Sequence, residues 1–365
     1  MEILSLTLVN FRNFSSKKII FDKNLPAGRQ GLTVIIGPNG SGKSNILEAI
    51  SYLSVTRSTR VETDLDLIKF SKDEAKIEAG IALNGEATKL TVNFLAIEER
   101  YVKKAYFVDS FKKRLSDFIS YLSIVIFHPS DLELVTGSPA TRRHHLDNYL
   151  SSIDRDFWRN ITAYNKILTR RNKVLARILE GKSKPSELDF WDSRLLEHGK
   201  YISKKREEFF EYLNFLESIL PGGRRGELNW QLRQSVINAE KILKNRERDI
   251  AAGMTLSGSH RDDFRFIFLG KDLQYFGSRG EQRMAVLALK LAELEYYQVK
   301  QGSRPILALD DIFSELDWEH REAVIAAVDK QQTIITAAEA DSVPKQLLKR
   351  ARVIELGQGI FAQRD

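Results

Sequence analysis

Hydrophobic and polar residues alternate along four stretches of the first hundred residues, and this two-residue period predicts β-strands. The stretches are ILSLTLVNF (residues 3–11), GLTVIIG (31–37), AKIEAGIAL (75–83) and TKLTVNFLAI (88–97). A Pro/Gly segment, LPAGRQG (25–31), separates the first two and is typical of a surface turn. The apolar run YLSIVIF (121–127) predicts a further, buried strand.

The pattern becomes helical between about residues 130 and 250. Strand patterns then return in three places, with an amphipathic helical stretch (275–295) between the first two of them: DFRFIFLG (263–270), PILALD (305–310) and QTIITAA (332–338). We therefore predict an α/β fold in which residues 1–125 and 251–365 together form one head. Residues 126–250 are predicted to be a helical lobe inserted in that head.

Two lines of residues run along the first long helical stretch. Apolar residues at spacings of three, four and seven mark a buried face: Phe157, Ile161, Tyr164, Leu168, Leu175 and Leu179. Basic residues displaced by two positions, about 200° around the helix, form a second line: Arg159, Lys166, Arg170, Lys173 and Arg177. Residues 157–179 contain no Asp or Glu, so this line suits the phosphates of DNA. The alternative is an ordinary solvated helix face.

Composition narrows the choice of partner and compartment. The chain has 365 residues, 42% of them hydrophobic, no cysteine and a net charge of +7. Residues 141–184 alone carry eleven Lys/Arg against four Asp/Glu, a local surplus that suggests an acidic partner. No apolar run reaches the roughly 18 residues of a membrane span, and the N-terminus lacks the basic start of a signal peptide. A soluble, cytoplasmic protein that does not bind membranes is predicted.

The sequence GPNGSGKS (37–44) follows the strand pattern LTVII and precedes the helical pattern NILEAISYL. It is the G-x-x-x-x-G-K-[ST] phosphate-binding loop in its strand–loop–helix context. Lys43 is the residue that reaches the β- and γ-phosphates of a nucleotide, and the Ser44 hydroxyl is a ligand for Mg²⁺. The residues assigned to nucleotide binding are Gly37, Pro38, Asn39, Gly40, Ser41, Gly42, Lys43, Ser44 and Asn45. A chance glycine turn is the competing interpretation.

Two carboxylates, Asp310 and Asp311, end the predicted buried strand PILALD. Asp310 is placed to hold Mg²⁺, and Asp311 is the candidate that polarises the attacking water. An Asp in place of the longer Glu at this position would suit slow hydrolysis. The alternative is an Asp-Asp pair that only caps the following turn.

The helical stretch between the last strands starts at Ser278-Arg279-Gly280, a glycine turn that suits an anion at a helix N-terminus. The chain order is phosphate loop, Ser-x-Gly helix start, strand with two acids, then SELD (314–317). This order resembles ABC-type ATPase heads. In such heads the Ser-x-Gly signature of one subunit contacts the nucleotide that is bound to the phosphate loop of the other subunit. The resemblance implies that Ser278 and Gly280 act on the partner's ATP and that hydrolysis releases the dimer.

Longer motifs resemble the RecF family of bacterial recombinational-repair ATPases, which is related to SMC heads. They are NFRNF (10–14), GPNGSGKSNILEAISYLS (37–54), RSTR (57–60), FHPSDLELVTGSPATRRHHLD (127–147), YNKILTRRN (164–172), WD (191–192), GSHRDDF (258–264) and LALDDIFSELD (307–317). The resemblance runs from end to end and is weakest at 193–226.

This resemblance implies an ABC-type head with mixed β-sheets and Mg²⁺-ATP as its cofactor. It implies an ATP-dependent homodimer on double-stranded or gapped DNA that works with RecR and RecO to load RecA. It also implies a weak, DNA-stimulated ATPase that serves as a switch. The resemblance places Arg12 and Arg57 near the nucleotide.

Some positions depart from the family pattern: Ser130 replaces Glu, His145 an aromatic residue, and Ser259 Pro. A magnesium-sensing glutamine and a switch histidine of the transporter type are not recognised. The neighbouring His144 and His145, like His260, suit packing or hydrogen bonds better than a metal. Another SMC-like ATPase head and a P-loop small-molecule kinase stay as alternative functions.

Overall fold

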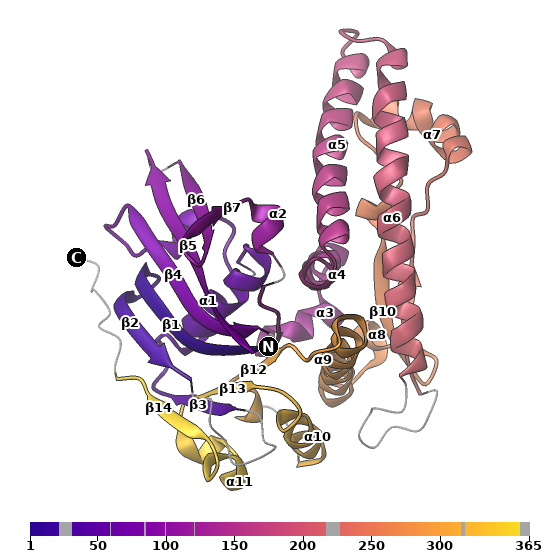
Figure 1. Cartoon of the computed structure of the whole chain (residues 1–365). Coiled ribbons are helices and arrows are strands. Elements are labelled where there is room, and N and C mark those ends of the chain that lie inside the picture. Colours follow the sequence, from indigo (N-terminus) through magenta and orange to yellow (C-terminus); the bar gives the residue numbers. More distant parts are fainter. Residues whose placement is uncertain are drawn as a thin grey trace, which may run out of the picture. The chain divides into compact units, whose positions relative to one another are not determined.

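The computed structural model (Figure 1) describes residues 1–21, 31–58, 60–83, 85–98, 100–119, 121–216, 227–314 and 318–357. Most of the expected Pro/Gly turn at 25–31 and residues 315–317 of the S-E-L-D motif lie outside this range. The described chain divides into two compact units. The first contains residues 1–131 and 287–357, and the second contains residues 132–216 and 227–286.

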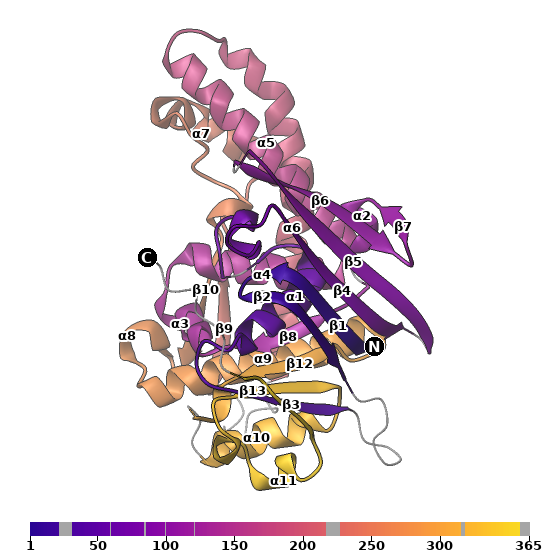
Figure 2. The ribbon, with the colours of Figure 1, turned by 90° about the vertical axis from the view of Figure 1, so that its left-hand side faces the viewer.

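The first unit contains an antiparallel sheet with the strand order β2-β1-β4-β5-β6-β7. The strands are β1 (Glu2–Phe11), β2 (Phe14–Ile20), β4 (Glu74–Leu83), β5 (Glu86–Ile97), β6 (Tyr101–Val108) and β7 (Phe111–Lys113). Figure 2 shows its long strands side by side. Side chains alternate between buried and more exposed along β4 and β5, which confirms the two-residue period predicted there.

A second, parallel sheet of the first unit has the order β14-β3-β13-β12-β8. Its strands are β3 (Leu32–Ile36), β8 (Ile124–Phe127), β12 (Ile306–Asp310), β13 (Thr333–Ala337) and β14 (Arg352–Glu355). Strands β12 and β13 are buried at every position, as expected for a sheet covered on both faces. Because all five strands are parallel, their carboxyl ends meet at one edge of the sheet.

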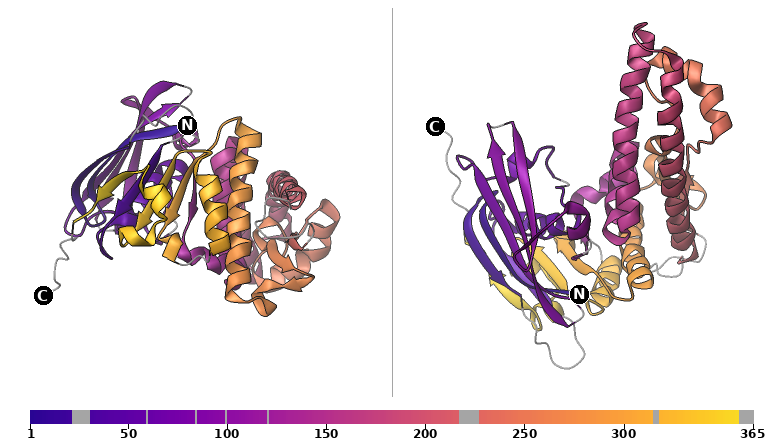
Figure 3. Two further views of the ribbon diagram at one scale, coloured as in Figure 1. Left: turned by 90° about the horizontal axis from the view of Figure 1, so that it is seen from below. Right: turned by 45° about the horizontal axis from the view of Figure 1, so that its top comes forward.

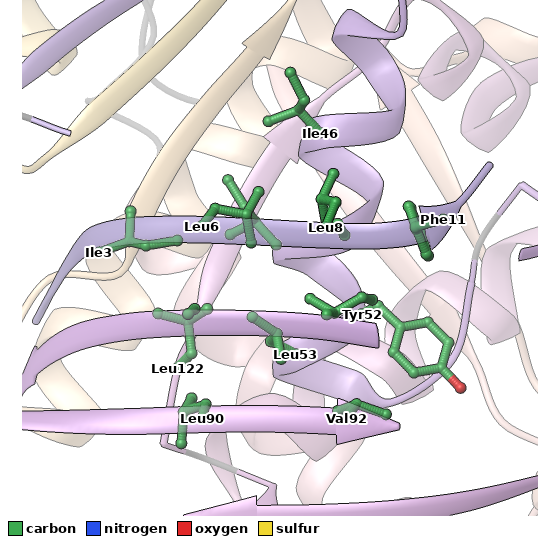
Figure 4. Close-up of a cluster of buried hydrophobic side chains, with 14 of the residues drawn as sticks. Ile3, Leu6, Leu8, Phe11, Ile46, Tyr52, Leu53, Leu90, Val92 and Leu122 are labelled. Atoms are coloured by element: carbon green, nitrogen blue, oxygen red, sulfur yellow. The ribbon is translucent and has the colours of Figure 1, made fainter. Parts of the chain in front are cut away.

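Helix α1 (Lys43–Val55) contacts β8, β12 and β13 of the parallel sheet and β5 of the antiparallel sheet. Ile46, Tyr52 and Leu53 of this helix join the hydrophobic core of both sheets (Figure 4). Gln332, just before β13, adds a polar link: its side chain accepts from Ile3 N at 2.7 Å and donates to Ile3 O at 2.8 Å. This link lies beside a register shift in β1. The two sheets and α1 therefore share one core.

The remaining helices of the first unit are short. They are η1 (Asp64–Leu67), α2 (Leu115–Phe118), η6 (Ile312–Ser314), α10 (Trp318–Val328), η7 (Ala340–Ser342) and α11 (Lys345–Leu348). The 3₁₀ helix η2 (Pro129–Leu132) leads into the second unit, and α9 (Arg279–Gln301) returns the chain to the first. The helix predicted at 275–295 is thus present, and its first turn begins at Arg279.

The second unit is mainly helical. Its helices are α3 (Glu133–Thr136), α4 (Pro139–Ile153), α5 (Arg155–Leu179), η3 (Pro185–Glu187), α6 (Leu188–Phe215), α7 (Ala239–Ala252), η5 (Ser259–Arg261) and α8 (Leu273–Phe276). The long helices α5 and α6 lie side by side (Figure 3). Of the predicted apolar stripe on α5, Phe157, Ile161, Tyr164 and Leu175 are buried. Leu168 is only partly buried, and Leu179, in the last turn, is exposed.

A three-stranded sheet, order β11-β10-β9, completes the second unit. Its strands are β9 (Leu228–Arg233), β10 (Asp263–Phe268) and β11 (Lys271–Asp272). Strand β9 was not expected in a helical block. It pairs with β10 from Asp263↔Arg233 to Phe268↔Leu228, so β10 belongs to the second unit. The second compact unit therefore continues to residue 286, beyond the boundary expected at 250.

Candidate functional site

The glycine loop between β3 and α1 is shaped by two residues in the left-handed region, Gly40 with φ of 81° and Gly42 with φ of 102°. A Cβ on Gly42 would lie 2.4 Å from Phe14 Cζ, so glycine is required there. Gly42 is also the N-cap of α1, and it has no side-chain cap and no acid in the first turn of the helix. The positive end of α1 is left open to an anion, which fits the phosphates of a nucleotide.

Two asparagines brace this loop from the β1–β2 hairpin and from α1. Asn13 Nδ2 donates to Ser41 O at 3.2 Å, and Asn45 Nδ2 donates to Asn13 Oδ1 at 2.9 Å. Phe14 packs against Gly42 from the same hairpin. The asparagine and phenylalanine of the NFRNF motif thus support the loop. Sequence reasoning placed Asn45 at the nucleotide, whereas the structure also gives it this bracing role.

Polar groups inside the loop fit a triphosphate. Lys43 is buried, and its Nζ donates to Gly37 O at 2.6 Å and to Pro38 O at 3.2 Å. Ser41 Oγ is buried and has no hydrogen-bond partner within the described part of the chain. Asn39 and Gly40 form the turn at the tip of the loop. A bound nucleotide would offer acceptors to both Lys43 and Ser41, so the residues present fit ATP.

The predicted magnesium ligands come together although they lie far apart in the chain. Ser44 Oγ donates to Asp310 Oδ1 at 3.1 Å. Thr336 Oγ1 donates to the same oxygen at 2.6 Å, and His128 Nδ1 lies 2.8 Å from Asp310 Oδ2. Burial alone would raise the pKa of Asp310, but the hydrogen bonds from His128, Thr336 and Ser44 outweigh it and lower that pKa. A carboxylate kept ionised beside a hydroxyl fits Mg²⁺.

Asp311 has a different environment from Asp310. It adopts a left-handed conformation, with φ of 52°. Its N–H donates to Thr336 O and to Thr336 Oγ1, both at 3.1 Å, while its carboxylate has no hydrogen-bond or ion-pair partner among the described residues. Holding a non-glycine residue in this conformation costs roughly 1 kcal/mol or more, which the surrounding bonds sustain. The turn separates the two carboxylates, so that Asp310 is fixed by Ser44, Thr336 and His128 while Asp311 is available for another task.

Sequence reasoning missed His128 and Thr336. His128 directly follows β8 and Thr336 lies near the end of β13, and these strands flank β12 on its two sides. Both strands were predicted, and the carboxyl ends of parallel strands meet at one sheet edge. Polar residues at those ends were therefore the available signal.

Arg12 lies beside the nucleotide loop through Glu48 of α1. Its guanidinium makes a two-pronged ion pair with Glu48, at 2.8 and 2.7 Å, and Glu48 is buried. Arg60 donates to Asn45 Oδ1 at 3.0 Å. Arg57, which the resemblance places near the nucleotide, is exposed, and its electrostatic neighbours are Tyr52 and Tyr106. Of the two arginines of the RSTR motif, Arg60 is the one in contact with the loop helix.

Ser278 and Glu281 form a capping box at the start of α9, within the second unit. Ser278 N donates to Glu281 Oε2 at 2.7 Å, and Glu281 N donates to Ser278 Oγ at 3.3 Å. These bonds lower the pKa of Glu281. A Cβ on Gly280 would meet nothing within 4 Å. The helix start is thus exposed and ordered by its own side chains, and Gly280 leaves open space next to it.

All five residues of the predicted basic stripe on α5 are exposed: Arg159, Lys166, Arg170, Lys173 and Arg177. One of them differs from the expectation. Arg159 makes an ion pair with Asp156 at 3.0 Å, an acid that directly precedes the acid-free stretch 157–179. Among the described residues, no carboxylate is paired with the other four, since Arg177 contacts only the carbonyl of Lys182. Four uncompensated cations therefore line this face.

Several motifs that carried the resemblance are structural in this chain. Arg171 is fully buried, with Asp192 at 2.6 Å and Asp249 at 2.8 Å. Arg206 is likewise buried and binds Asp262 at 2.7 Å and Asp147 at 2.6 Å. These ion pairs join α5 to α6 and α7, and α6 to α4 and the segment before β10. The TRRN, WD and RDD motifs therefore include residues that hold the helices of the second unit together.

The histidine of the GSHRDDF motif is also used in packing. His260 Nδ1 lies 2.8 Å from the Tyr164 hydroxyl, and its Nε2 lies 3.1 Å from Thr255 O. Burial lowers the pKa of His260 to about 4. His144 Nε2 lies 3.1 Å from the Asn148 amide. Both rings are engaged in hydrogen bonds, as the sequence suggested.

A parallel sheet places an open phosphate loop beside the buried carboxylate of Asp310, and an antiparallel sheet shares its core. Together with the helical unit, this arrangement defines an ATPase head of the SMC/ABC type. The family described as RecF/RecN/SMC N-terminal domain matches residues 2–356. The chain belongs to the RecF family, because full-length RecF proteins are 34–37% identical to it over 98% of its length. This confirms the resemblance and favours it over the small-molecule kinase.

Known relatives cover almost the whole chain. The DNA replication and repair protein RecF of Moorella thermoacetica is 37% identical over 98% of this chain and 96% of its own length. The RecF protein of Bacillus cytotoxicus is 34% identical, over 98% of each. The described part of the chain contains no helix that is both long and apolar enough to cross a membrane.

Two solved structures share the fold along most of their length. Both are of a RecF recombination mediator of the RecFOR pathway, one with ATP and one with an ATP analogue. They are 28% identical, cover 94% of this chain and 93–94% of theirs, and give TM-scores of 0.84 and 0.83. The Smc head of Pyrococcus furiosus, at 17% identity and a TM-score of 0.51, shares the fold alone.

Proposed function

We propose that this protein is an ATP-controlled DNA-binding switch of recombinational repair. The observation that carries the proposal is the hydrogen bond between Ser44 and Asp310, beside a phosphate loop whose helix has an open N-terminus. When bound, Mg²⁺ would be held by these two side chains and would neutralise phosphate charge. Lys43 would bind the outer phosphates, and Asp311 would orient the attacking water, with slow hydrolysis as the result.

ATP binding on this chain is supported by its relatives as well as by the loop. The RecF structures at 28% identity contain ATP or an ATP analogue. Arg12 would set the position of the loop helix through Glu48, since their ion pair joins the β1–β2 hairpin to α1. Arg57, with its exposed side chain, would approach the nucleotide only from the surface.

The nucleotide is proposed to join two copies of the chain. Ser278 and Gly280 start α9 with open space beside the glycine, a geometry that leaves room for a phosphate of another molecule. In the closed homodimer they would bind the γ-phosphate of the partner's ATP, through backbone N–H groups at a helix N-terminus. Hydrolysis removes that phosphate, and the dimer opens.

Duplex or gapped DNA is the proposed acidic partner. Four exposed cations of α5 without paired carboxylates in the described structure support it: Lys166, Arg170, Lys173 and Arg177. The named relatives act in replication and repair and in the RecFOR pathway. We infer that this chain works with RecR and RecO in helping to load RecA, in the cytoplasm, where the bacterial chromosome lies.

Sedimentation with and without ATP, and with and without gapped duplex DNA, tests the proposal. The wild-type chain is expected to dimerise with Mg²⁺-ATP, while Lys43→Arg stays a monomer because the shape of the buried ammonium site is lost. Lys112→Arg, on exposed β7, is the matched control and should dimerise normally. Undiminished ATP-dependent dimerisation of Lys43→Arg would contradict the mechanism. Catalysis by a monomer would favour the small-molecule kinase.

A further inference from the structure

A second concentration of basic residues lies in the first unit, in the segment 100–114 that contains β6 and β7. This segment, RYVKKAYFVDSFKKR, has six Lys/Arg and one acid, Asp109. Lys104 pairs with Asp64 at 2.7 Å. The other five cations are exposed and have no carboxylate partner in the described part of the chain: Arg100, Lys103, Lys112, Lys113 and Arg114. We call these five residues and the strands that carry them the basic hairpin.

The basic hairpin has a fixed backbone at the outer edge of the antiparallel sheet (Figure 2). Its two-residue turn, Asp109-Ser110, has φ of 49° and 72°, the positive values of a hairpin turn that matches the twist of the strands. Asp109 also fastens the turn to β5, because its N–H donates to Lys89 O at 2.9 Å and its Oδ1 accepts from Lys89 N at 2.7 Å. The acid of this segment is therefore engaged by a backbone N–H.

The free cations occupy both faces of the hairpin. Lys112 lies opposite Phe107, which shares its face of β6 with Lys103 because side chains alternate along a strand. Lys113, the next residue of β7, points to the other face. Both faces of the hairpin and both of its flanks, at Arg100 and Arg114, thus present positive charge to solvent.

Strand β6 is also fixed to the helix that follows the phosphate loop. Lys104 Nζ donates to the Tyr52 hydroxyl at 3.1 Å, and this hydroxyl donates to Asp64 Oδ1 at 2.9 Å. Tyr52 is a fully buried residue of α1. Lys104 therefore holds β6 against α1, while its neighbour Lys103 is exposed.

Lysines on an edge strand can serve only to prevent pairing with another chain. That explanation suits β7, which ends the described sheet. It does not account for Lys103, because β6 is paired with β5 on one side and with β7 on the other. It does not account for Arg100 and Arg114 either, since they precede β6 and follow β7. The whole set is better explained by a polyanionic partner.

We propose that the basic hairpin is a second DNA-binding surface and that it contacts the phosphates of duplex DNA. The inference rests on the proposed function and deepens it, because it gives the nucleotide-binding unit a DNA contact of its own besides the stripe on α5. Contacts from lysine and arginine to phosphates position a protein on DNA without reading its sequence. The hairpin is therefore expected to bind without sequence preference.

The salt dependence of binding to a fluorescent duplex tests the proposal, measured by anisotropy on the full chain with Mg²⁺-ATP. In the test variant, Lys112, Lys113 and Arg114 are changed to Gln. Each phosphate contact contributes about 0.9 to the slope of log K against log salt, so three lost contacts should lower the slope by about 2.7. Between about 50 and about 200 mM salt, the wild-type affinity should then fall about 40-fold more than that of the variant.

Two further variants separate contact from charge and from folding. Lys345, Lys349 and Arg352 changed to Gln remove the same charge from exposed positions of α11 and β14 in the same unit, and should keep the wild-type slope. A charge-preserving hairpin variant, with Lys112 and Lys113 changed to Arg and Arg114 to Lys, should also keep it. Urea unfolding should give all three variants the stability of the wild type.

A wild-type slope in the test variant would overturn the hairpin as a DNA surface and leave the proposed function standing, since the wild-type chain still binds DNA. Equal reductions of the slope in the test variant and in the α11/β14 variant would overturn it too, because they would show an effect of net charge alone. A wild-type chain that does not bind duplex DNA would overturn the proposed function and the hairpin together.

Discussion

Ser44 Oγ donates a hydrogen bond to Asp310 Oδ1 at 3.1 Å, across 266 residues of sequence. The contact exists because β3, which leads into the Ser44 loop, and β12, which ends at Asp310, both pair with β13 in one parallel sheet. The other carboxylate oxygen of Asp310 is held by His128 at the end of β8. Three strand ends thus fix the orientation of a single carboxylate before any metal arrives.

His128→Ala should raise the Mg²⁺ concentration needed for ATP binding. Without the ring, Asp310 Oδ2 loses its partner in a buried place, and the carboxylate is held only at Oδ1, by Ser44 and Thr336. Loss of a group that orients a metal ligand typically costs about 10- to 100-fold in metal affinity. Titration of Mg²⁺ at fixed ATP and fixed pH measures the shift. His128→Asn keeps an amide donor, so its Mg²⁺ requirement should lie between those of the wild type and His128→Ala. Equal Mg²⁺ requirements in all three proteins would contradict this role of His128.

Much of the first unit could be predicted because its chemistry is local. The strand before Gly37, the glycine loop, the helix after it and the strand ending at Asp310 are each visible in a short stretch of residues. The contacts of His128 and Thr336 with Asp310 are not local, since they depend on the order of strands in the sheet. That order is determined by how the core packs, and it cannot be derived from the spacing of residues along the chain.

The second unit shows how a visible signal was missed. Arg171 lies seven residues after Tyr164 and four before Leu175, which places it on the buried apolar stripe of α5. A charge on such a stripe requires buried partners, and Asp192 and Asp249 supply them from two other helices. The helical period alone could therefore have indicated the burial of Arg171, which the sequence analysis did not predict. Its partners could not be predicted, since they come from α6 and α7.

Neighbouring arginines of α5 should differ sharply in their effect on stability. Arg171→Met leaves Asp192 and Asp249 buried without their shared cation, which should lower the free energy of unfolding by about 3–5 kcal/mol. Arg170→Met changes an exposed residue of the same type and should stay within about 0.5 kcal/mol of the wild type. Urea unfolding followed by circular dichroism compares them. Similar values for the two variants would show that the buried cluster does not stabilise the unit.

Alanine substitutions at two glycines should affect different properties, ATP binding by the phosphate loop in one case and ATP-driven dimerisation in the other. Gly42→Ala forces a side chain into a left-handed position against Phe14 and Asn13, and should weaken ATP binding more than tenfold. Gly280→Ala meets no neighbour and replaces glycine in a helix, so the monomer should be equally stable or gain up to about 1 kcal/mol. Its added methyl group should nevertheless reduce ATP-driven dimerisation.

Denaturation of the apo monomers and sedimentation with ATP measure the two properties separately for both glycine variants. Normal dimerisation of Gly280→Ala would argue against a phosphate at the start of α9. Wild-type ATP affinity in Gly42→Ala would show that the loop tolerates the side chain and that its positive φ is not required.

His260 should make the protein less stable in mild acid. Burial lowers its pKa to about 4, whereas the unfolded chain has an ordinary value of about 6.5. Above about pH 6.5 both states are neutral there, and as the pH falls towards 4 only the unfolded state gains the proton. Stability is therefore lost over that interval, by at most about 3 kcal/mol. His260→Gln should show a smaller loss between pH 7 and pH 5 in matched urea titrations, and parallel losses would contradict the assignment.

Charge reversal should show whether the basic stripe on α5 contacts DNA or is an ordinary solvated helix face. The triple variant of Arg170, Lys173 and Arg177 to Glu should bind duplex DNA more weakly, and the slope of log K against log salt should fall by about 3 if each residue contacts one phosphate. A second triple variant, Lys200, Lys204 and Lys244 to Glu, changes the net charge equally at exposed positions of α6 and α7. This control variant should keep the wild-type slope of log K against log salt. The slope counts the counterions released where cations contact phosphates, whereas a distant charge changes only the long-range attraction. Fluorescence anisotropy at several salt concentrations measures both, and equal slopes in the two variants would assign the stripe to solvent.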